Sequence, residues 1–296
     1  MKKAGTGAAP ATLPPALAAE LRPGQSVGLL QELHILTRDA RLNQDSRRKL
    51  KQVYHLVQFI EPLLEEVLAA QNHVSLVDHG SGKSYLGFIL HDLFFRQRPG
   101  AGTITGIETR AELVEKSRAL AARLGFDGMQ FHALSVAEAI TSPLLPGRVD
   151  VVTALHACDT ATDDALRFAL ARQARHVVLV PCCQAEVAGV LRRHKARALA
   201  AGPLAEIWRH ALHTREFGSE VTNVLRCLQL EAHGYQVTVT ELVGWEHSMK
   251  NELIIASYRG QSGRQAGARL AGLLDLLGLE DLRARFFVPG AEATPA

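Results

Sequence analysis

Between residues 74 and 180, short apolar runs alternate with longer amphipathic segments, and this alternation limits the fold more than any other feature of the sequence. The apolar runs cover residues 74–77, 103–107, 129–133, 149–155 and 176–180. The segments between them, over residues 85–95, 111–124 and 162–172, repeat apolar side chains at a spacing of three or four. Strands that alternate with helices in this way predict βαβ units and a parallel sheet with both faces covered. We therefore expect an α/β fold of the doubly wound, Rossmann-like class.

Two further β-rich runs, over residues 236–243 and 253–258, come after a mostly helical stretch at 185–233. The loop between them is too short for a crossover helix, so this pair is expected to be antiparallel. Together with the five earlier runs, they predict a mostly parallel seven-stranded sheet with an antiparallel last strand.

The remaining sequence divides around this sheet. Residues 1–25, rich in glycine and proline, predict a flexible leader, and residues 26–70 predict an N-terminal helical extension of two amphipathic helices. Residues 71–260 form the expected α/β domain, and residues 261–296 a C-terminal helix and tail. Of the 296 residues 47% are hydrophobic and 21% charged, a composition that argues against a disordered or low-complexity chain.

Location and metal content can also be predicted. Pro10, Pro14 and Pro15 interrupt the apolar stretch that a signal peptide needs, and no uncharged apolar run reaches the roughly 18 residues of a membrane span. We expect a cytoplasmic protein with no membrane contact. The four cysteines, at 158, 182, 183 and 227, contain no CxxC pair, which favours reduced thiols and no bound metal.

A glycine-containing turn follows the first apolar run, at residues 79–84 (HGSGKS). It is not a P-loop, because GxxxxGK[ST] would require glycine at Val77. It approximates the dinucleotide pattern GxGxxG, with Gly80, Gly82 and a displaced Gly87. Glu108 ends the second run 26 residues beyond Gly82, where a carboxylate could accept the ribose hydroxyls of an adenosine-containing cofactor. The alternative is an ordinary tight turn with a solvated Glu108.

Further motifs distinguish between the adenosine cofactors. Asp78-x-Gly-x-Gly resembles the first motif of class I S-adenosylmethionine (SAM)-dependent methyltransferases, and an antiparallel strand inserted at the end of the sheet is typical of that fold. Residues 155–163 (LHACDTATD), 180–184 (VPCCQ) and 250–256 (KNELIIA) are similar to the family whose eukaryotic members are called methyltransferase-like or ribosomal RNA adenine dimethylase domain-containing proteins. The resemblance covers about residues 45–258 and implies a SAM-dependent methyltransferase.

The resemblance also implies the cofactor site. Asp78, Gly80, Ser81 and Gly82 would hold the amino acid end of SAM, Glu108 with Thr109 the ribose, and His132, Ala133 and Leu134 the adenine, with Leu155 also at the cofactor. Relatives commonly place an acidic or amide side chain at the adenine amino group, whereas residues 131–135 offer only the backbone or Ser135. Lys83 could reach the cofactor carboxylate or solvent.

The acceptor site is expected at the same edge of the sheet, because ligands of open α/β sheets bind beyond the carboxyl ends of the strands. His156 and Asp159 are the candidate catalytic residues. His156 could position the acceptor or act as its general base, or it could buttress the helix near residue 162. Cys182, Cys183, Gln184, Lys250 and Asn251 are the candidate substrate residues, and the loop at 245–251 is either a substrate lip or a polar hairpin loop. The Asn/Asp-Pro-Pro-aromatic motif is missing after the fourth run, which argues against methylation of adenine N6.

Positive charge is concentrated between the two N-terminal helices. Arg41, Arg47, Arg48, Lys49 and Lys51 face only Asp39 and Asp45, whereas the whole chain has a net charge of only +3. This segment is either a solvated helix face or a contact for a polyanion.

We expect a macromolecular acceptor, RNA ahead of ribosomal protein, and a monomer or weak dimer. The alternatives are a catalytically silent RNA-binding or assembly module with the same fold, and an NAD-dependent oxidoreductase.

Overall fold

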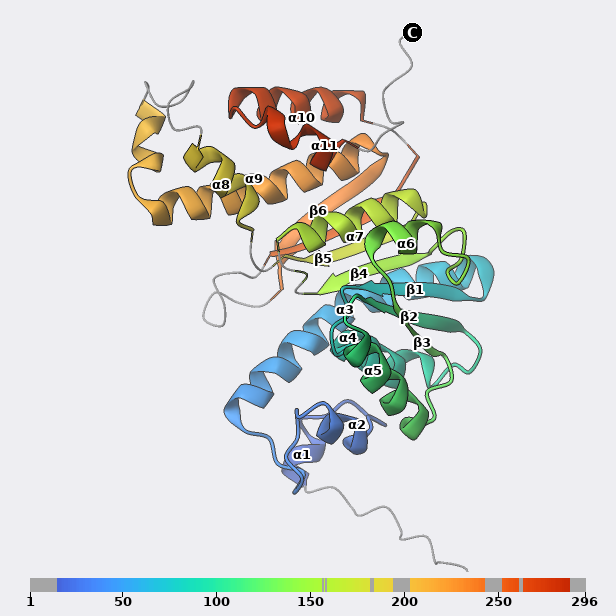
Figure 1. Cartoon of the computed structure of the whole chain (residues 1–296). Helices are drawn as coiled ribbons and strands as arrows, with labels where there is room; N and C mark the ends of the chain where they lie inside the picture. Colours follow the sequence, from blue (N-terminus) through green and yellow to red (C-terminus); the bar gives the residue numbers. More distant parts are fainter. Residues whose placement is uncertain are drawn as a thin grey trace, which may run out of the picture.

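The sheet is mostly parallel and has the predicted antiparallel insertion. A computed structural model describes residues 15–155, 157, 159–181, 184–193, 203–242, 252–260 and 263–287. The strands are β1 (Val74–His79), β2 (Gly102–Glu108), β3 (Met129–Ala133), β4 (Val151–Leu155), β5 (His176–Val180), β6 (Tyr235–Glu241) and β7 (Glu252–Tyr258). The described residues form a seven-stranded sheet in the order β3-β2-β1-β4-β5-β7-β6 (Figure 1). Only β7 runs against the other strands, between β5 and β6, so the predicted fold class is confirmed.

Helices cover both faces of the sheet (Figure 1). Those before β4 are α1 (Pro15–Ala18), α2 (Val27–Glu32), α3 (Gln44–Gln71), α4 (Tyr85–Leu90), α5 (Ala111–Leu124) and α6 (Val136–Thr141), and a π-helical turn, His91–Phe95, continues α4. Those after β4 are α7 (Thr160–Ala171), α8 (Glu186–Arg193), α9 (Ala211–Ala232), α10 (Arg264–Leu276) and α11 (Arg283–Phe286), with 3-10 turns at Pro203–Trp208 and Glu280–Leu282. The apolar pattern does not predict α6, which begins at a capping box of Ser135 and Glu138.

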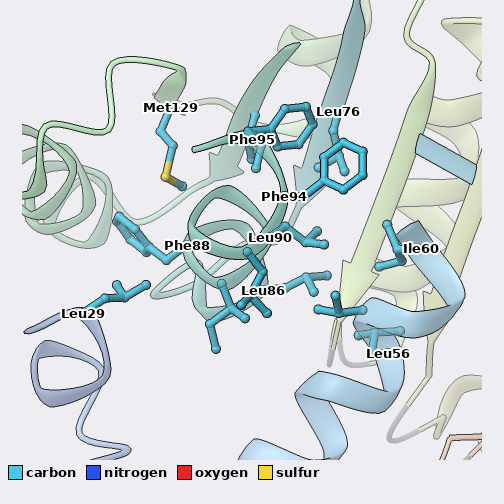
Figure 2. Packing of buried hydrophobic residues seen from close by; sticks show 14 of the residues in the cluster. Leu29, Leu56, Ile60, Leu76, Leu86, Phe88, Leu90, Phe94, Phe95 and Met129 are labelled. Carbon is cyan, nitrogen blue, oxygen red and sulfur yellow. The ribbon is translucent and has the colours of Figure 1, made fainter. Parts of the chain in front are cut away.

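The N-terminal extension and the sheet share one core. Because strand side chains alternate between faces, Leu76 points into the cluster under α3, α4 and α5, whereas Val77 points into the cluster under α7. Figure 2 shows α4 surrounded on the first face by Leu29 of α2, Leu56 and Ile60 of α3, and Met129 of β3. A third cluster joins α8, α9, α10 and α11 beyond the end of the sheet.

The last eleven residues of the predicted leader, 15–25, pack against the rest of the protein. Residues 15–18 form α1, and Leu17 is buried in the same core as Leu29. Arg22 forms an ion pair with Glu61 of α3, at 2.7 Å, and its guanidinium lies over the ring of Tyr54. These contacts stabilise a segment whose own composition predicts no structure.

The long helix α3 is longer than the strands and extends past the ends of the sheet. It ends at Gln71, three residues before β1 begins, and the chain then reverses direction. At about 1.5 Å per residue its 28 residues span about 42 Å, whereas the six residues of β1 span about 20 Å. The first half of α3 therefore extends beyond the carboxyl ends of the parallel strands, as Figure 1 shows.

Candidate active site

The turn after β1 has the conformation that its glycines predict. Gly80 and Gly82 have φ angles of +67° and +55°, in the left-handed region that strains residues with a side chain. The backbone N–H of Ser81 donates to the carbonyl of Ile107 at 3.0 Å, which fixes the turn against the end of β2. A Cβ atom on Gly80 would lie 3.7 Å from the Cβ of Ala157, in the loop after β4. The loops after β1 and β4 therefore approach each other where the strand order reverses, the usual ligand crevice of such sheets.

Asp78 lies in the floor of this crevice. Its side chain is only 2% exposed, and its Oδ1 accepts a hydrogen bond at 2.9 Å from the hydroxyl of Thr153, its register partner on β4. Burial raises the pKa of Asp78 to about 7, and the Thr153 bond offsets only part of this effect. A carboxyl group that titrates near neutrality can become charged when a cation, such as the ammonium group of an amino acid, lies beside it.

The next residue, His79, points to the other face of the sheet. Its ring lies 5.6 Å from the ring of Phe168 in α7, and within the described part of the chain neither ring nitrogen has a hydrogen-bond partner. Burial lowers its pKa to about 4, against the opposing charge of Glu108. His79 is therefore a neutral core residue at neutral pH.

Glu108 reaches from the end of β2 to the glycine turn. Its Oε2 accepts from the backbone N–H of Gly82 at 2.9 Å, and the guanidinium of Arg110 donates to both carboxylate oxygens, at 2.9 and 3.1 Å. Burial alone would raise the pKa of Glu108, but the donors of Arg110 and Gly82 outweigh it and lower the pKa to about 2. The hydroxyl of Thr109 donates to the same carboxylate at 3.3 Å. Glu108 is thus held, as an anion, at the position expected for the ribose.

The predicted adenine residues lie beside Glu108. Ala133 is its register partner on β3, and His132 and Leu134 flank Ala133. Burial, and then the charge of Arg118, lower the pKa of His132, so its ring is neutral at neutral pH. Ser135 is less available than the sequence suggests, because its hydroxyl donates to the Glu138 carboxylate at 2.6 Å and accepts from the Glu138 N–H as the cap of α6.

The loop after β4 contains a strained backbone position. Leu155 ends β4 at the crevice, and Asp159 has φ 50° and ψ −122°, a conformation that costs a residue with a side chain about 1–3 kcal/mol. The Asp159 carboxylate accepts from the backbone N–H groups of Ala185 and Glu186, at 2.9 and 3.2 Å, and so caps α8. Asp159 therefore has a structural contact, and its expected catalytic role stays a prediction. The other predicted catalytic residue, His156, lies outside the described residues.

Arg226, on α9, hydrogen-bonds to the loop after β4 and to the start of α7. Its side chain is completely buried, donates to both carboxylate oxygens of Asp163 at 2.7 and 2.9 Å, and donates to the carbonyl of Asp159 at 2.9 Å. Arg226 also donates to the side-chain oxygen of Asn223. The amide NH₂ of Asn223 in turn donates to the carboxylate of Glu252, at the start of β7. The loops after β4 and β5 and the start of β7, which carry the motifs at 155–163, 180–184 and 250–256, thus meet in one polar network.

The predicted substrate residue Gln184 belongs to this network. It is 4% exposed, its amide NH₂ donates to Asn223 at 3.0 Å, and its oxygen accepts from Ser219 at 2.6 Å. One N–H and the oxygen of this buried amide are thus engaged by α9, and its expected contact with a substrate stays a prediction. The other predicted substrate residues, Cys182, Cys183, Lys250 and Asn251, lie outside the described residues.

The sequence patterns missed Thr153, Arg110 and Arg226. Thr153 and Arg226 sit within an apolar strand and a helix, where only the tertiary structure shows their partners. Arg110 could have been found from its place two residues after Glu108 at the start of a helix. Among the residues described, no group of three or more histidine, cysteine or acidic side chains could hold a metal ion. A search of the same residues finds no helix long and apolar enough to span a membrane.

Comparison with known proteins supports the expected enzyme class. Residues 48–190 match the family model described as a methyltransferase domain. A curated relative, the glutathione S-transferase C-terminal domain-containing protein homolog of Drosophila pseudoobscura pseudoobscura, is 25% identical over 217 residues. That match covers 66% of this chain and 35% of the relative, so the chain spans about a third of the relative's length.

Solved structures that resemble this chain share little of its sequence. The magnesium protoporphyrin IX methyltransferase of Synechocystis PCC 6803 with bound SAH has a TM-score of 0.44 at 15% identity, over 79% of this chain and 96% of that chain. The fibrillarin pre-rRNA processing protein of Methanococcus jannaschii has a TM-score of 0.41 at 11% identity, over 64% and 68%. The methyltransferase-domain match and the strand order support a SAM-dependent methyltransferase of class I, with SAM as its methyl donor.

Proposed function

We propose that this protein transfers a methyl group from SAM to a macromolecular acceptor, with RNA favoured over protein. One observation carries the proposal: a buried Asp78, a left-handed glycine turn and an anionic Glu108 lie together at the carboxyl ends of β1 and β2, and Glu108 accepts from the Gly82 N–H. Asp78 and the glycine turn match the amino acid end of SAM, with its ammonium group, and Glu108 matches the ribose diol. When bound, SAM supplies a methyl group on a cationic sulfur, which is transferred by in-line displacement.

The chain's own residues would bind and orient the two reactants. Asp78 and the glycine turn would hold the amino acid end of SAM, and Glu108 would fix its ribose. His156 follows β4 directly, and its role as base or positioning group at the acceptor remains part of this proposal. The motif resemblance at residues 155–163, 180–184 and 250–256 supports the same acceptor edge.

The preference for RNA rests on the charge of α3. Arg47, Arg48, Lys49 and Lys51 are exposed on the first two turns, in the half of the helix that projects beyond the carboxyl edge. Arg47 is paired with Glu20 at 2.8 Å, whereas no ion pair involves Lys49 or Lys51 within the described part of the chain. A cationic surface beside the acceptor edge would attract phosphates and position an RNA for methylation.

The cofactor is tested by titration calorimetry with S-adenosylhomocysteine (SAH), the demethylated product. Native protein should bind SAH with 1:1 stoichiometry, and Gly80→Arg should abolish binding because the new side chain fills the turn. Asp78→Ala should weaken binding because the ammonium group loses its counter-ion. Tight binding that survives both substitutions would refute the proposed site, and nicotinamide cofactor competing with SAH would favour an oxidoreductase.

The acceptor is tested with radiolabelled SAM and separate RNA and ribosomal-protein fractions from a strain that lacks this protein. Label should appear in RNA, and Lys49→Ala should weaken RNA binding and lower its salt dependence, since it removes one phosphate contact. Arg269→Ala, on α10, is the control, because it also removes one exposed positive charge. It should change neither the affinity for RNA nor the salt dependence of binding. RNA that binds but takes no label would favour the second candidate, a catalytically silent RNA-binding module. Label in ribosomal protein alone would reverse the preference for RNA.

A further inference from the structure

We infer that Arg110 stands in for the cofactor ribose and covers Glu108 until SAM displaces it. The inference rests on the proposed function, because it takes Glu108 as the ribose-binding group. It assigns Arg110 a role in setting cofactor affinity.

The hydrogen bonds around Glu108 leave no place for a ribose diol. Its Oε1 accepts from the backbone N–H of Arg110 at 3.1 Å and from the Arg110 Nε at 2.9 Å, in addition to the Thr109 hydroxyl. Its Oε2 accepts from the Arg110 Nη2 at 3.1 Å and from the Gly82 N–H. A carboxylate offers about four lone-pair positions, and five donors already surround this one.

The Arg110 guanidinium, which supplies two of these donors, can leave without unfolding the site. The Gly82 N–H belongs to the backbone of the glycine turn, whereas the Arg110 side chain is 60% exposed and ends in solvent. The Glu108 side chain is only 7% exposed beneath it. Two ribose O–H donors would therefore replace the two guanidinium N–H donors, and the carboxylate would remain an acceptor throughout.

The position of Arg110 in α5 supports a role outside the helix. Arg110 is the N-cap of this helix, yet its side chain caps no backbone N–H. Serine, threonine, asparagine and aspartate are favoured at this position, and a cation is unfavourable beside the positive end of the helix dipole. An arginine at this N-cap does not stabilise the helix, and its place beside a candidate ligand site indicates a functional role.

The inference is tested with SAH and with 5′-methylthioadenosine, which keeps the ribose but lacks the amino acid. Arg110→Ala and Arg110→Asn should bind both ligands about two- to fivefold more tightly than native protein at low salt, because the guanidinium no longer competes for Glu108. Raising the salt concentration should narrow this difference, because salt screens the pair in the native protein.

Arg123→Ala is the matched control. Arg123 is 57% exposed and pairs with Glu32 at 2.9 Å, far from the glycine turn, so its loss should leave both affinities unchanged. Weaker or unchanged binding in both Arg110 variants, with native binding intact, would overturn this inference alone. If neither native protein nor the Arg110 variants bind SAH, the proposed function fails and the inference fails with it.

Discussion

Asp78→Asn should stabilise the cofactor-free protein at high pH. Asp78 is buried, and its pKa is raised from 3.8 to about 7, a difference of about 3 units. At 1.36 kcal/mol per unit, burying the ionised form costs about 4 kcal/mol. Asparagine is neutral at every pH, and its side-chain oxygen can keep the hydrogen bond from Thr153.

The sign follows from proton binding. An unfolded Asp78 loses its proton near pH 3.8, whereas the folded one keeps it to about pH 7. The contribution of the protonated carboxyl to the free energy of unfolding is therefore complete below pH 3.8 and is lost as the pH rises through 7. The stability difference between Asp78→Asn and native protein should be near zero at pH 4 and grow to about 4 kcal/mol by pH 8.

Urea unfolding followed by circular dichroism, at intervals from pH 5 to 8 and without cofactor, measures this difference. The buried histidines His79, His91 and His176, whose pKa values burial lowers to about 4, add stability as the pH rises from 4 to 6.5, but equally in both proteins. Thr153→Val, which removes the hydrogen bond that favours the charged form, should move the loss of stability to higher pH. A difference between Asp78→Asn and native protein that does not change with pH would refute the reasoning.

Two further perturbations test the packing around the acceptor edge. Arg226→Met should cost about 3–5 kcal/mol in the free energy of unfolding, because it leaves Asp163 buried without its partner, and a second substitution, Asp163→Leu, should recover much of the loss. Urea unfolding of the single and double variants decides this, and equal stability of both would contradict it. Gly218→Ala should cost about 1–3 kcal/mol because its Cβ would lie 2.7 Å from Ala188, whereas Gly272→Ala, in open space on α10, should gain up to about 1 kcal/mol. Thermal unfolding of this pair should therefore move Tm in opposite directions, and parallel shifts would show that the α8–α9 contact is not close-packed.

The sheet could be read from the sequence because each strand carries its own signal. The run at 129–133 is confirmed residue for residue as β3, and the short loop before residue 252 is enough to make β7 antiparallel. Helix ends were less predictable. The run at 85–95 is one apolar pattern but two structures, α4 and a π-helical turn. The pattern records which side is buried and not how many residues each turn contains.

The sequence by itself determined the fold class and the crevice residues Asp78, Gly80, Gly82 and Glu108, because strand alternation and a glycine turn are local properties of consecutive residues. Only the tertiary structure decided the roles of residues whose partners are distant along the chain. The positions of Asp159 and Gln184 at strand ends predict site residues, and only the structure shows their contacts with α8 and α9. Arg226 lies 63 residues from Asp163 and Arg110 covers Glu108, and such pairings depend on burial and distance, which the order of residues does not specify.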